Sequence, residues 1–326
     1  MAVNVDGETP VTMAMVFPGQ GSQFAGMGRE IMAASGAARA IFAEADDILG
    51  IALTRLCHDG PAKELEDTYN AQPAILTVGV ATLAAIRERA AEAGRTIEPA
   101  VVAGHSLGEF TALVASDAFD FADALRLVRE RGRLMREAGE LSPGGMAAVI
   151  GLDDEALAAV CAGAASEGLV AIANANCPGQ TVISGEVPAL LRAMDLAKAA
   201  GAKRVARLAV SIASHSPLMA EASAALGEAV AATPMRPPRV PVIANVTARP
   251  MTTPEEIRAE LRQQMERPVQ WTGSVRTMAG MGMTTVIELG PGQVLSGLIK
   301  RIDRALVTLG PADLDLGLPT ERPTAG

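Results

Sequence analysis

The stretch Ala100-Val-Val-Ala-Gly-His-Ser-Leu-Gly-Glu109 decides the fold of this chain. Its first four residues predict a buried strand closed by Gly104, and a helix is expected to open near Glu109. The residues between them fit the pattern G-x-S-x-G, whose glycines allow a sharp turn that holds the Ser106 hydroxyl clear of the sheet. The backbone N–H of Leu107 then points where an oxyanion would form. The pattern predicts a serine nucleophile, with an ordinary strand-to-helix turn as the alternative.

A serine nucleophile needs a base, and the chain has only three histidines, His58, His105 and His215. His105 is the neighbour of the serine in the turn, so its side chain should diverge from it. His58 lies in an expected surface loop. His215 follows a predicted strand over Arg204–Val210, which is a usual place for catalytic residues in α/β folds. Elimination therefore favours His215, the alternative being an incidental histidine in a helix-capping region.

Further apolar runs and helical segments place this turn in an α/β fold with a parallel sheet. Thr12–Phe17 predicts a second buried strand, and helices are expected over 74–91 and 121–137. The loop Pro18–Gln23 fails as a dinucleotide loop because Phe24 occupies the place of the third glycine, and no G-K-[ST] makes it a P-loop. A glycine-rich strand end can instead donate backbone N–H groups, which would suit the second arm of an oxyanion hole.

A second folding unit is expected between residues 141 and 210. Strands are predicted at 146–150, 170–175, 181–184 and 204–210, with helices at 153–165 and 187–200. This β-α-β-β-α-β order is that of the ferredoxin-like unit. We expect it to be inserted into a larger subdomain made of residues 12–140 and 211–310, with flexible tails at 1–11 and 311–326.

Composition excludes several classes of function. The chain has 326 residues, 49% of them apolar, and a net charge of −9, so it can build a large core and does not have the charge of a bulk nucleic-acid binder. Three widely spaced cysteines favour a reducing cytosol over a disulfide framework or zinc site. The apolar stretch 73–86 is too short to span a bilayer and predicts a buried helix. The N-terminal residues include Asp6 and Glu8 and do not resemble a signal peptide.

Seven motifs occur in an order that resembles the malonyl-CoA:acyl carrier protein transacylases of fatty acid synthesis and the related acyltransferases of polyketide synthases. The resemblance runs from about residue 14 to 305. The motifs are Phe17-Pro-Gly-Gln-Gly-Ser-Gln23, Gly104-His-Ser-Leu-Gly-Glu109, Arg131-Gly132, Asn174-x-Asn176-x-Pro178-Gly179-Gln180, Ser214-His215-x-x-Leu218-Met219, Pro268-Val-Gln-Trp271 and Glu288-x-Gly290-Pro291-Gly292.

The resemblance implies an α/β-hydrolase-like subdomain with an inserted ferredoxin-like one, and it implies catalytic roles. Ser106 corresponds to the acylated nucleophile and His215 to the base. The family orients this histidine through a backbone carbonyl instead of an Asp, and Gln270 matches that position. Gln20 and Leu107 match the backbone donors of the oxyanion hole.

Substrate-binding roles follow from the same resemblance. Five arginines crowd the predicted helix at 121–137, and helical periodicity does not select one of them. The resemblance selects Arg131 as the partner of the free malonyl carboxylate. It also places Asn174 and Ser214 among the substrate-binding residues. The small Ser214 leaves room beside the acyl α-carbon, as in relatives that accept bulkier units and in many fatty-acid-type enzymes, whereas Leu107 after the nucleophile favours malonyl.

The implied reaction moves a malonyl or related dicarboxylic acyl group from CoA to the phosphopantetheine thiol of an acyl carrier protein by a ping-pong mechanism. It implies no metal or redox cofactor, and we expect a cytoplasmic monomer that binds neither nucleic acid nor membrane. Carrier proteins are acidic, so docking on this acidic chain needs a local basic patch. The candidates are Lys300, Arg301 and Arg304, with Lys203, Arg204 and Arg207 on the small subdomain.

The sequence leaves three other interpretations open. One is a trans-acting polyketide acyltransferase selective for a branched extender unit. Another is a serine esterase, which would orient His215 through an aspartate and would leave Arg131 without a purpose. The third is a non-catalytic binding module, against which the presence of Ser106, His215 and Arg131 argues. The aspartates open to an esterase are Asp117, Asp120, Asp123 and Asp195.

Overall fold

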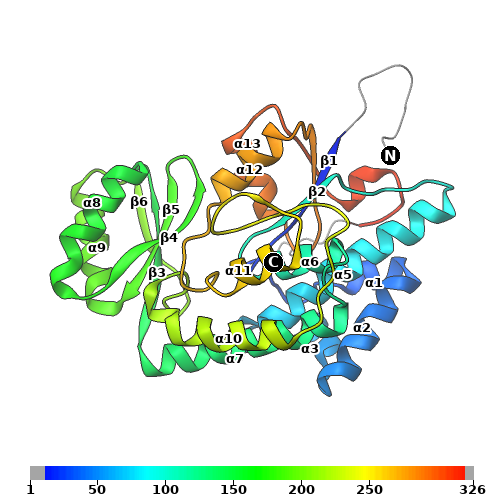
Figure 1. Cartoon of the computed structure of the whole chain (residues 1–326), viewed down its shortest axis with the longest axis horizontal. Coiled ribbons are helices and arrows are strands. Elements are labelled where there is room, and N and C mark those ends of the chain that lie inside the picture. The colour runs from blue at the N-terminus through cyan, green and yellow to red at the C-terminus, as the bar shows by residue number, and fades with distance from the viewer. Residues whose placement is uncertain (1–11, 320–326) are drawn as a thin grey trace.

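The computed structural model describes residues 12–319 and contains two sheets, each in its own subdomain (Figure 1). The larger sheet has six strands in the order β10-β9-β1-β2-β7-β8. All neighbours are parallel except β7 and β8, which are antiparallel. The strands are β1 (Met13–Phe17), β2 (Val101–Gly104), β7 (Val242–Ile243), β8 (Pro250–Met251), β9 (Thr285–Glu288) and β10 (Val307–Leu309).

The register of the central pair brings two sequence motifs together. Phe17 at the end of β1 pairs with Gly104 at the end of β2. Because both strands run in the same direction, the loop after β1 and the turn after β2 leave the sheet at the same edge. The predicted serine turn and the glycine-rich loop are therefore neighbours.

Helices cover both faces of this sheet, as alternation along β1 requires. Met15 and Phe17 face one core cluster, whereas Ala14 and Val16 face a second cluster that contains residues of α12 and α13. The helices of this subdomain are α1 (Arg29–Ala34), α2 (Gly36–Leu49), α3 (Leu53–Asp59), α4 (Ala62–Glu66), α5 (Thr68–Glu92), α6 (Gly108–Ala115), α7 (Phe121–Leu141), α10 (Ala220–Ala232), α11 (Pro254–Leu261), α12 (Trp271–Gly280) and α13 (Val294–Ile302).

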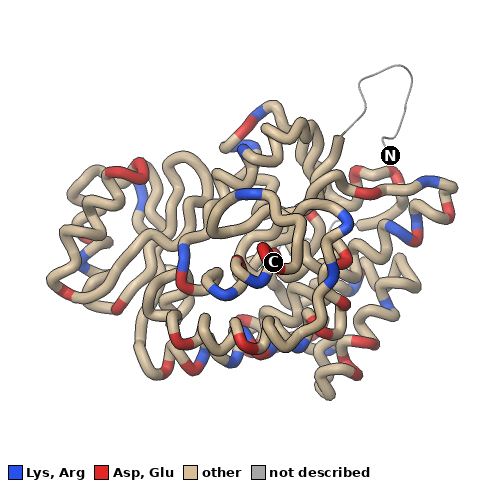
Figure 2. Tube along the Cα trace, viewed as in Figure 1, with Lys and Arg blue, Asp and Glu red and all other residues tan. Residues whose placement is uncertain are grey.

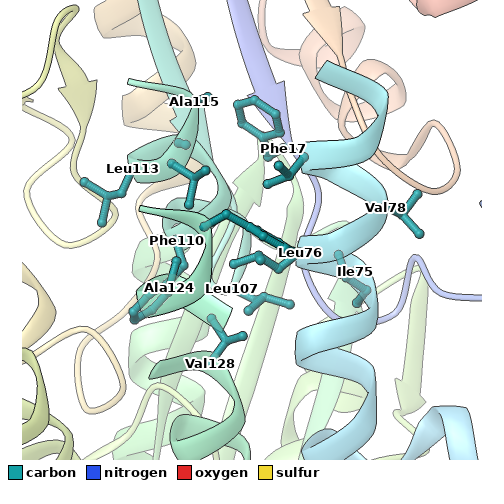
Figure 3. Close-up of a cluster of buried hydrophobic side chains, with 14 of the residues drawn as sticks. Phe17, Ile75, Leu76, Val78, Leu107, Phe110, Leu113, Ala115, Ala124 and Val128 are labelled. Atoms are coloured by element: carbon teal, nitrogen blue, oxygen red, sulfur yellow. The ribbon is translucent and has the colours of Figure 1, made fainter. Parts of the chain in front are cut away.

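Helix α5 lies inside the larger core. By length and composition alone it could cross a membrane, but 83% of its most apolar window is buried within the protein. Figure 3 shows Ile75 and Leu76 of α5 in the same apolar cluster as Leu107 and Phe110. The predicted buried helix over 73–86 is thus part of a longer helix whose surroundings are protein side chains.

The smaller subdomain has the predicted ferredoxin-like order. Its sheet runs β4-β5-β3-β6, with every pair antiparallel, and both of its helices pack on one face. Figure 1 shows it as a separate lobe beside the larger sheet. The elements are β3 (Gly144–Ile150), α8 (Asp154–Ala164), β4 (Val170–Cys177), β5 (Gln180–Glu186), α9 (Val187–Ala199) and β6 (Arg204–Arg207).

Backbone hydrogen bonds join the two subdomains. The Ala175 N–H on β4 donates to the Val269 carbonyl of the larger subdomain at 2.9 Å, and the Val269 N–H donates to the Ala173 carbonyl at 2.8 Å. This ladder-like connection fixes β4 against the segment that precedes α12.

The prediction of a flexible tail from residue 311 is wrong for residues 311–319. Pro311–Leu314 form a 3₁₀ turn, and Leu316 and Leu318 are buried in the larger core cluster. Burial of these two apolar side chains holds a segment whose Pro, Gly and Asp content suggested disorder. The predicted tails at 1–11 and 320–326 lie outside the described residues.

Candidate active site

The turn after β2 has the strained shape that a nucleophile elbow requires. Ser106 has a φ of 53°, which lies in the left-handed region that residues other than glycine rarely adopt. The flanking glycines permit the turn, because a Cβ on Gly104 would lie 1.9 Å from the Gly108 carbonyl and one on Gly108 would lie 2.0 Å from the Phe17 carbonyl oxygen. The turn is also tied to β7, since Asn245 Oδ1 accepts from the Ser106 N–H at 2.6 Å.

The structure places His215 against the serine. Its Nε2 lies 2.7 Å from Ser106 Oγ, and its Nδ1 lies 2.9 Å from the Gln264 carbonyl and 3.2 Å from the Arg267 carbonyl. Because carbonyl oxygens only accept, Nδ1 carries the proton and Nε2 is left to accept from the serine hydroxyl. His105, by contrast, points to Asn176 Oδ1 at 2.8 Å.

The prediction that Gln270 provides the backbone carbonyl that orients His215 is wrong. Gln270 precedes α12, and its carbonyl accepts from the N–H of Ser274 at 2.9 Å. The carbonyls at His215 instead come from Gln264 and Arg267, in the turn after α11. The physical reason is that the carbonyl of a residue at the start of a helix accepts a hydrogen bond from the first helical turn. In the irregular turn after α11, the carbonyls of Gln264 and Arg267 have no such helical donor and can accept from His215.

Arg131 is buried beside the nucleophile, with a side chain held by amide oxygens. Its Nη1 donates to Gln72 Oε1 at 2.8 Å, and its Nη2 donates to Gln264 Oε1 at 3.0 Å and to Ser106 Oγ at 3.1 Å. Burial lowers its pKa to about 10, so it stays charged at neutral pH. Among the described residues no salt bridge involves Arg131, so its charge has no direct carboxylate partner.

Gln264 connects these three groups and was missed by the sequence reasoning. Its carbonyl accepts from His215, its Oε1 accepts from Arg131, and its Nε2 donates to the Ser106 carbonyl at 2.9 Å. No motif around residue 264 signals such a role, because a glutamine in a turn is ordinary. Asn245 was missed for the same reason, although it lies where β7 ends at the same sheet edge.

Of the two expected oxyanion donors, Leu107 follows Ser106 in the chain and Gln20 lies on the loop after β1. Gln20 lines the cleft that contains Ser106, and Leu107 follows the serine at the start of α6. Neither N–H donates to another described residue, so both are available to a developing oxyanion. The side chain of Gln20 accepts from the Thr68 hydroxyl at 2.9 Å, which holds its loop against α5.

A cleft of about 400 Å³ opens over Ser106 between the two subdomains. Asn174 and Ser214, the other expected substrate-binding residues, both line it. Apolar side chains come from α7, from the small subdomain and from the segment that directly follows it. They include Met135, Met146, Leu208, Val210 and Ile212.

The aspartates that an esterase would use as orienters are engaged elsewhere. Among the described salt bridges, Asp117 and Asp120 pair with Arg239 and Arg236, and Asp123 and Asp195 pair with neighbours on their own helices. Two carbonyls occupy the position beside His215 Nδ1 that an aspartate would need. Within residues 12–319, no group of three or more His, Cys, Asp or Glu side chains could hold a metal ion.

The electrostatics of His215 predict its pH dependence. Burial lowers the pKa of His215 to about 3, and the charges of Arg131 and His105 act in the same direction. A lowered pKa keeps the neutral, proton-accepting form to more acid pH. We therefore expect kcat/KM for Ser106 acylation to stay nearly constant from pH 8 down to about pH 4. Acylation rates from quenched reactions between pH 4 and 8 check this prediction. A fall in kcat/KM with a midpoint near pH 6.5 would contradict it.

Comparisons with known proteins agree with this geometry. Residues 14–306 match the model of the acyl transferase domain family. The chain is 47% identical over 302 residues to the malonyl CoA-acyl carrier protein transacylase of Bacillus subtilis, covering 92% of this chain and 93% of the relative.

Two solved structures are similar along most of their length. The acyl carrier protein S-malonyltransferase of Vibrio cholerae superposes with a TM-score of 0.86 at 43% identity, covering 92% of this chain and 96% of that one. A malonyl-transacylase in complex with its type II PKS acyl-carrier protein has a TM-score of 0.86 at 42% identity, covering 92% and 95%.

Proposed function

The chain belongs to the acyl transferase domain family, and from this premise and the geometry of the cleft we propose that it transfers a malonyl group from CoA to an acyl carrier protein. The observation that carries the proposal is the buried Arg131 guanidinium, 3.1 Å from the nucleophile Ser106. A fixed, buried cation at this position suits an acyl group that bears its own carboxylate.

Acylation follows from the contacts. Ser106 Oγ attacks the thioester carbon of malonyl-CoA while its proton passes to His215 Nε2. The carbonyl oxygen becomes an oxyanion within reach of the N–H groups of Gln20 and Leu107. The tetrahedral intermediate collapses, the C–S bond breaks, and the CoA sulfur takes the proton from His215. The product is a malonyl ester on Ser106.

The second half repeats these steps in reverse order with a different thiol. The phosphopantetheine thiol of the carrier protein gives its proton to His215 and attacks the Ser106 ester. The bond between the acyl carbon and Ser106 Oγ then breaks, and His215 Nε2 returns the proton to Oγ, which restores the serine hydroxyl. A thioester is exchanged for a thioester, so the proposed reaction needs no metal or redox cofactor. Apolar side chains around the cleft limit the entry of water, which would otherwise hydrolyse the acyl-enzyme.

Steady-state kinetics test the proposal. With malonyl-CoA and a holo acyl carrier protein as substrates, initial rates should give parallel double-reciprocal lines, as a covalent acyl-enzyme requires. The mass of the carrier protein should rise by one malonyl group. Consumption of malonyl-CoA with no transfer to the carrier protein would contradict a transferase and favour an esterase.

We propose malonyl as the preferred acyl group, with a branched extender unit as the competing outcome. Met135 and Ile212 line the same cleft as Ser214, so large apolar side chains bound the site together with the small serine. Comparing kcat/KM for malonyl-, methylmalonyl- and ethylmalonyl-CoA decides between the two. Preference for a branched unit would show that this space accepts an α-substituent.

The carrier protein is proposed to dock on basic residues at one end of the small sheet. Ile150 pairs with Gln180 on one side and with Arg204 on the other, and Arg301 of α13 donates to Gln180 Oε1. Gln180, Ile150 and Arg204 are therefore cross-strand neighbours, and adjacent strands lie about 4.8 Å apart. This spacing places Arg204 on the same surface as Arg301, which is hydrogen-bonded to Gln180. Elsewhere both signs of charge are interspersed along the chain (Figure 2).

This docking surface gives a charge-reversal prediction. Arg301→Glu should raise the KM for the carrier protein about tenfold at low salt and leave Ser106 acylation by malonyl-CoA unchanged. The matched control is Arg126→Glu, at an exposed side chain of α7, which should change neither. Equal effects of the two variants, or no salt dependence, would contradict docking at this surface.

We also propose a cytoplasmic, monomeric enzyme. A reducing compartment suits its three free cysteines, all of which are buried. Light scattering coupled to size exclusion measures the oligomeric state directly.

A further inference from the structure

Glu109 directly follows the G-x-S-x-G turn, is fully buried, and has no part in the reaction described above. Its two carboxylate oxygens each accept an N–H hydrogen bond. Oε1 accepts from the Asn245 backbone at 3.0 Å, and Oε2 accepts from Gln264 Nε2 at 2.6 Å. These two partners are the residues that hold the nucleophile turn and the catalytic groups.

The bond to Gln264 determines how its side-chain amide is oriented. Nε2 faces two acceptors, Glu109 Oε2 and the Ser106 carbonyl, so Oε1 must face Arg131. A glutamine amide can rotate by half a turn at little intrinsic cost, which would turn its NH₂ group toward the guanidinium. The Glu109 carboxyl opposes that rotation, because its Oε2 accepts from Gln264 Nε2 and would face the amide oxygen instead.

We propose that Glu109 is a positioning residue that sets Arg131, through Gln264, for the carboxylate of the acyl substrate. The inference rests on the proposed function, because it concerns how that site selects a dicarboxylic acyl group. Glu109 does not touch the reacting atoms. It fixes the amide oxygen that holds one arm of a guanidinium otherwise free of carboxylate partners.

A neighbouring carboxyl provides an internal contrast. Glu260 is buried nearby and accepts from the Val246 N–H at 2.7 Å through Oε1, but within residues 12–319 its side chain forms no hydrogen bond or salt bridge with Gln264 or Arg131. Burial raises the pKa of Glu260 to about 7, and burial together with Glu260 raises the pKa of Glu109. Of the two carboxyls, only Glu109 accepts a hydrogen bond from Gln264.

The same substitution at the two sites should therefore have different results. A glutamine at 260 can still accept from the Val246 N–H through its amide oxygen, as a protonated carboxyl would. A glutamine at 109 has only one oxygen for two N–H donors, so its NH₂ group must face either the Asn245 N–H or Gln264 Nε2, and two donors then oppose each other. Glu109→Gln should lower kcat/KM for Ser106 acylation by malonyl-CoA about tenfold or more, chiefly through KM. Acylation by acetyl-CoA, which has no free carboxylate, should change less than threefold. Glu260→Gln should keep the native ratio of the two substrates.

Single-turnover acylation followed by intact-protein mass measures both rates on each variant. An equal loss with malonyl-CoA and acetyl-CoA in Glu109→Gln would overturn the inference, since it would indicate a general structural defect. So would an equal change of the substrate ratio in Glu260→Gln. Lack of malonyl acylation in the native chain would instead contradict the proposed function itself.

A second variant keeps the test decisive if Glu109→Gln folds poorly. Gln264→Met keeps the backbone carbonyl at His215 and removes the side-chain link between Glu109 and Arg131. It should reproduce the selective loss with malonyl-CoA, and adding Glu109→Gln to it should not lower the substrate ratio further. A native ratio in Gln264→Met would overturn the inference.

Discussion

Replacing Ser106 by Ala should lower kcat/KM for malonyl transfer by a factor of about 10⁴ or more. The reason is chemical: without Oγ there is no atom 2.7 Å from His215 Nε2 that can form the acyl ester. The oxyanion donors and the cleft remain, but they have no covalent intermediate to stabilise. Quantifying malonylated carrier protein by mass over several hours measures a residual rate of this size.

The matched control for this variant is Ser116→Ala. Ser116 is also buried, but it ends α6, and its hydroxyl donates to the Leu113 carbonyl. It should transfer malonyl groups at nearly the native rate. If Ser106→Ala kept more than a few per cent of native activity, the nucleophile would have to be another residue.

Replacing Arg131 by Ala should be the second largest effect. Loss of a buried, charge-assisted pair with the substrate carboxylate should lower kcat/KM for malonyl-CoA about 10²–10³-fold. Acylation by acetyl-CoA should fall much less, because an acetyl group offers no carboxylate to the guanidinium. The ratio of the two rates, measured by single-turnover acylation, separates a lost substrate contact from a damaged active site.

Arg133→Ala is the control on the same helix. Arg133 is partly exposed and pairs with Glu130 and Glu137 on its own helix, so its replacement should leave the substrate ratio unchanged. An Arg131→Ala variant that transferred malonyl and acetyl groups in the native ratio would exclude Arg131 as the carboxylate partner.

Local patterns in the sequence predicted the elements that carry the nucleophile. The apolar run and the glycines of residues 100–108 indicated β2, the turn and the start of α6, because each feature acts on adjacent residues. The order of short strands and helices between 144 and 210 likewise indicated the ferredoxin-like subdomain. Parallel pairing of β1 and β2 then explains why two motifs more than 80 residues apart meet at one edge.

The rest of the site depends on contacts that leave no local pattern. The orienting carbonyl belongs to Gln264 and not to Gln270, and a backbone carbonyl is common to every residue type, so side-chain identity could not locate it. Arg131 differs from the other arginines of its helix in being buried against Gln72, Gln264 and Ser106. Residues 311–319 pack because of Leu316 and Leu318, two apolar side chains within a composition typical of loops.

The most direct test of the central claim is to trap the acyl-enzyme. The native chain is mixed with malonyl-CoA in the absence of carrier protein, digested, and analysed by peptide mass spectrometry, and a second sample is first chased with holo acyl carrier protein. We predict one malonyl group on Ser106 that disappears in the chase as malonyl carrier protein forms. No adduct on Ser106, or an adduct that the carrier protein does not remove, would contradict the account.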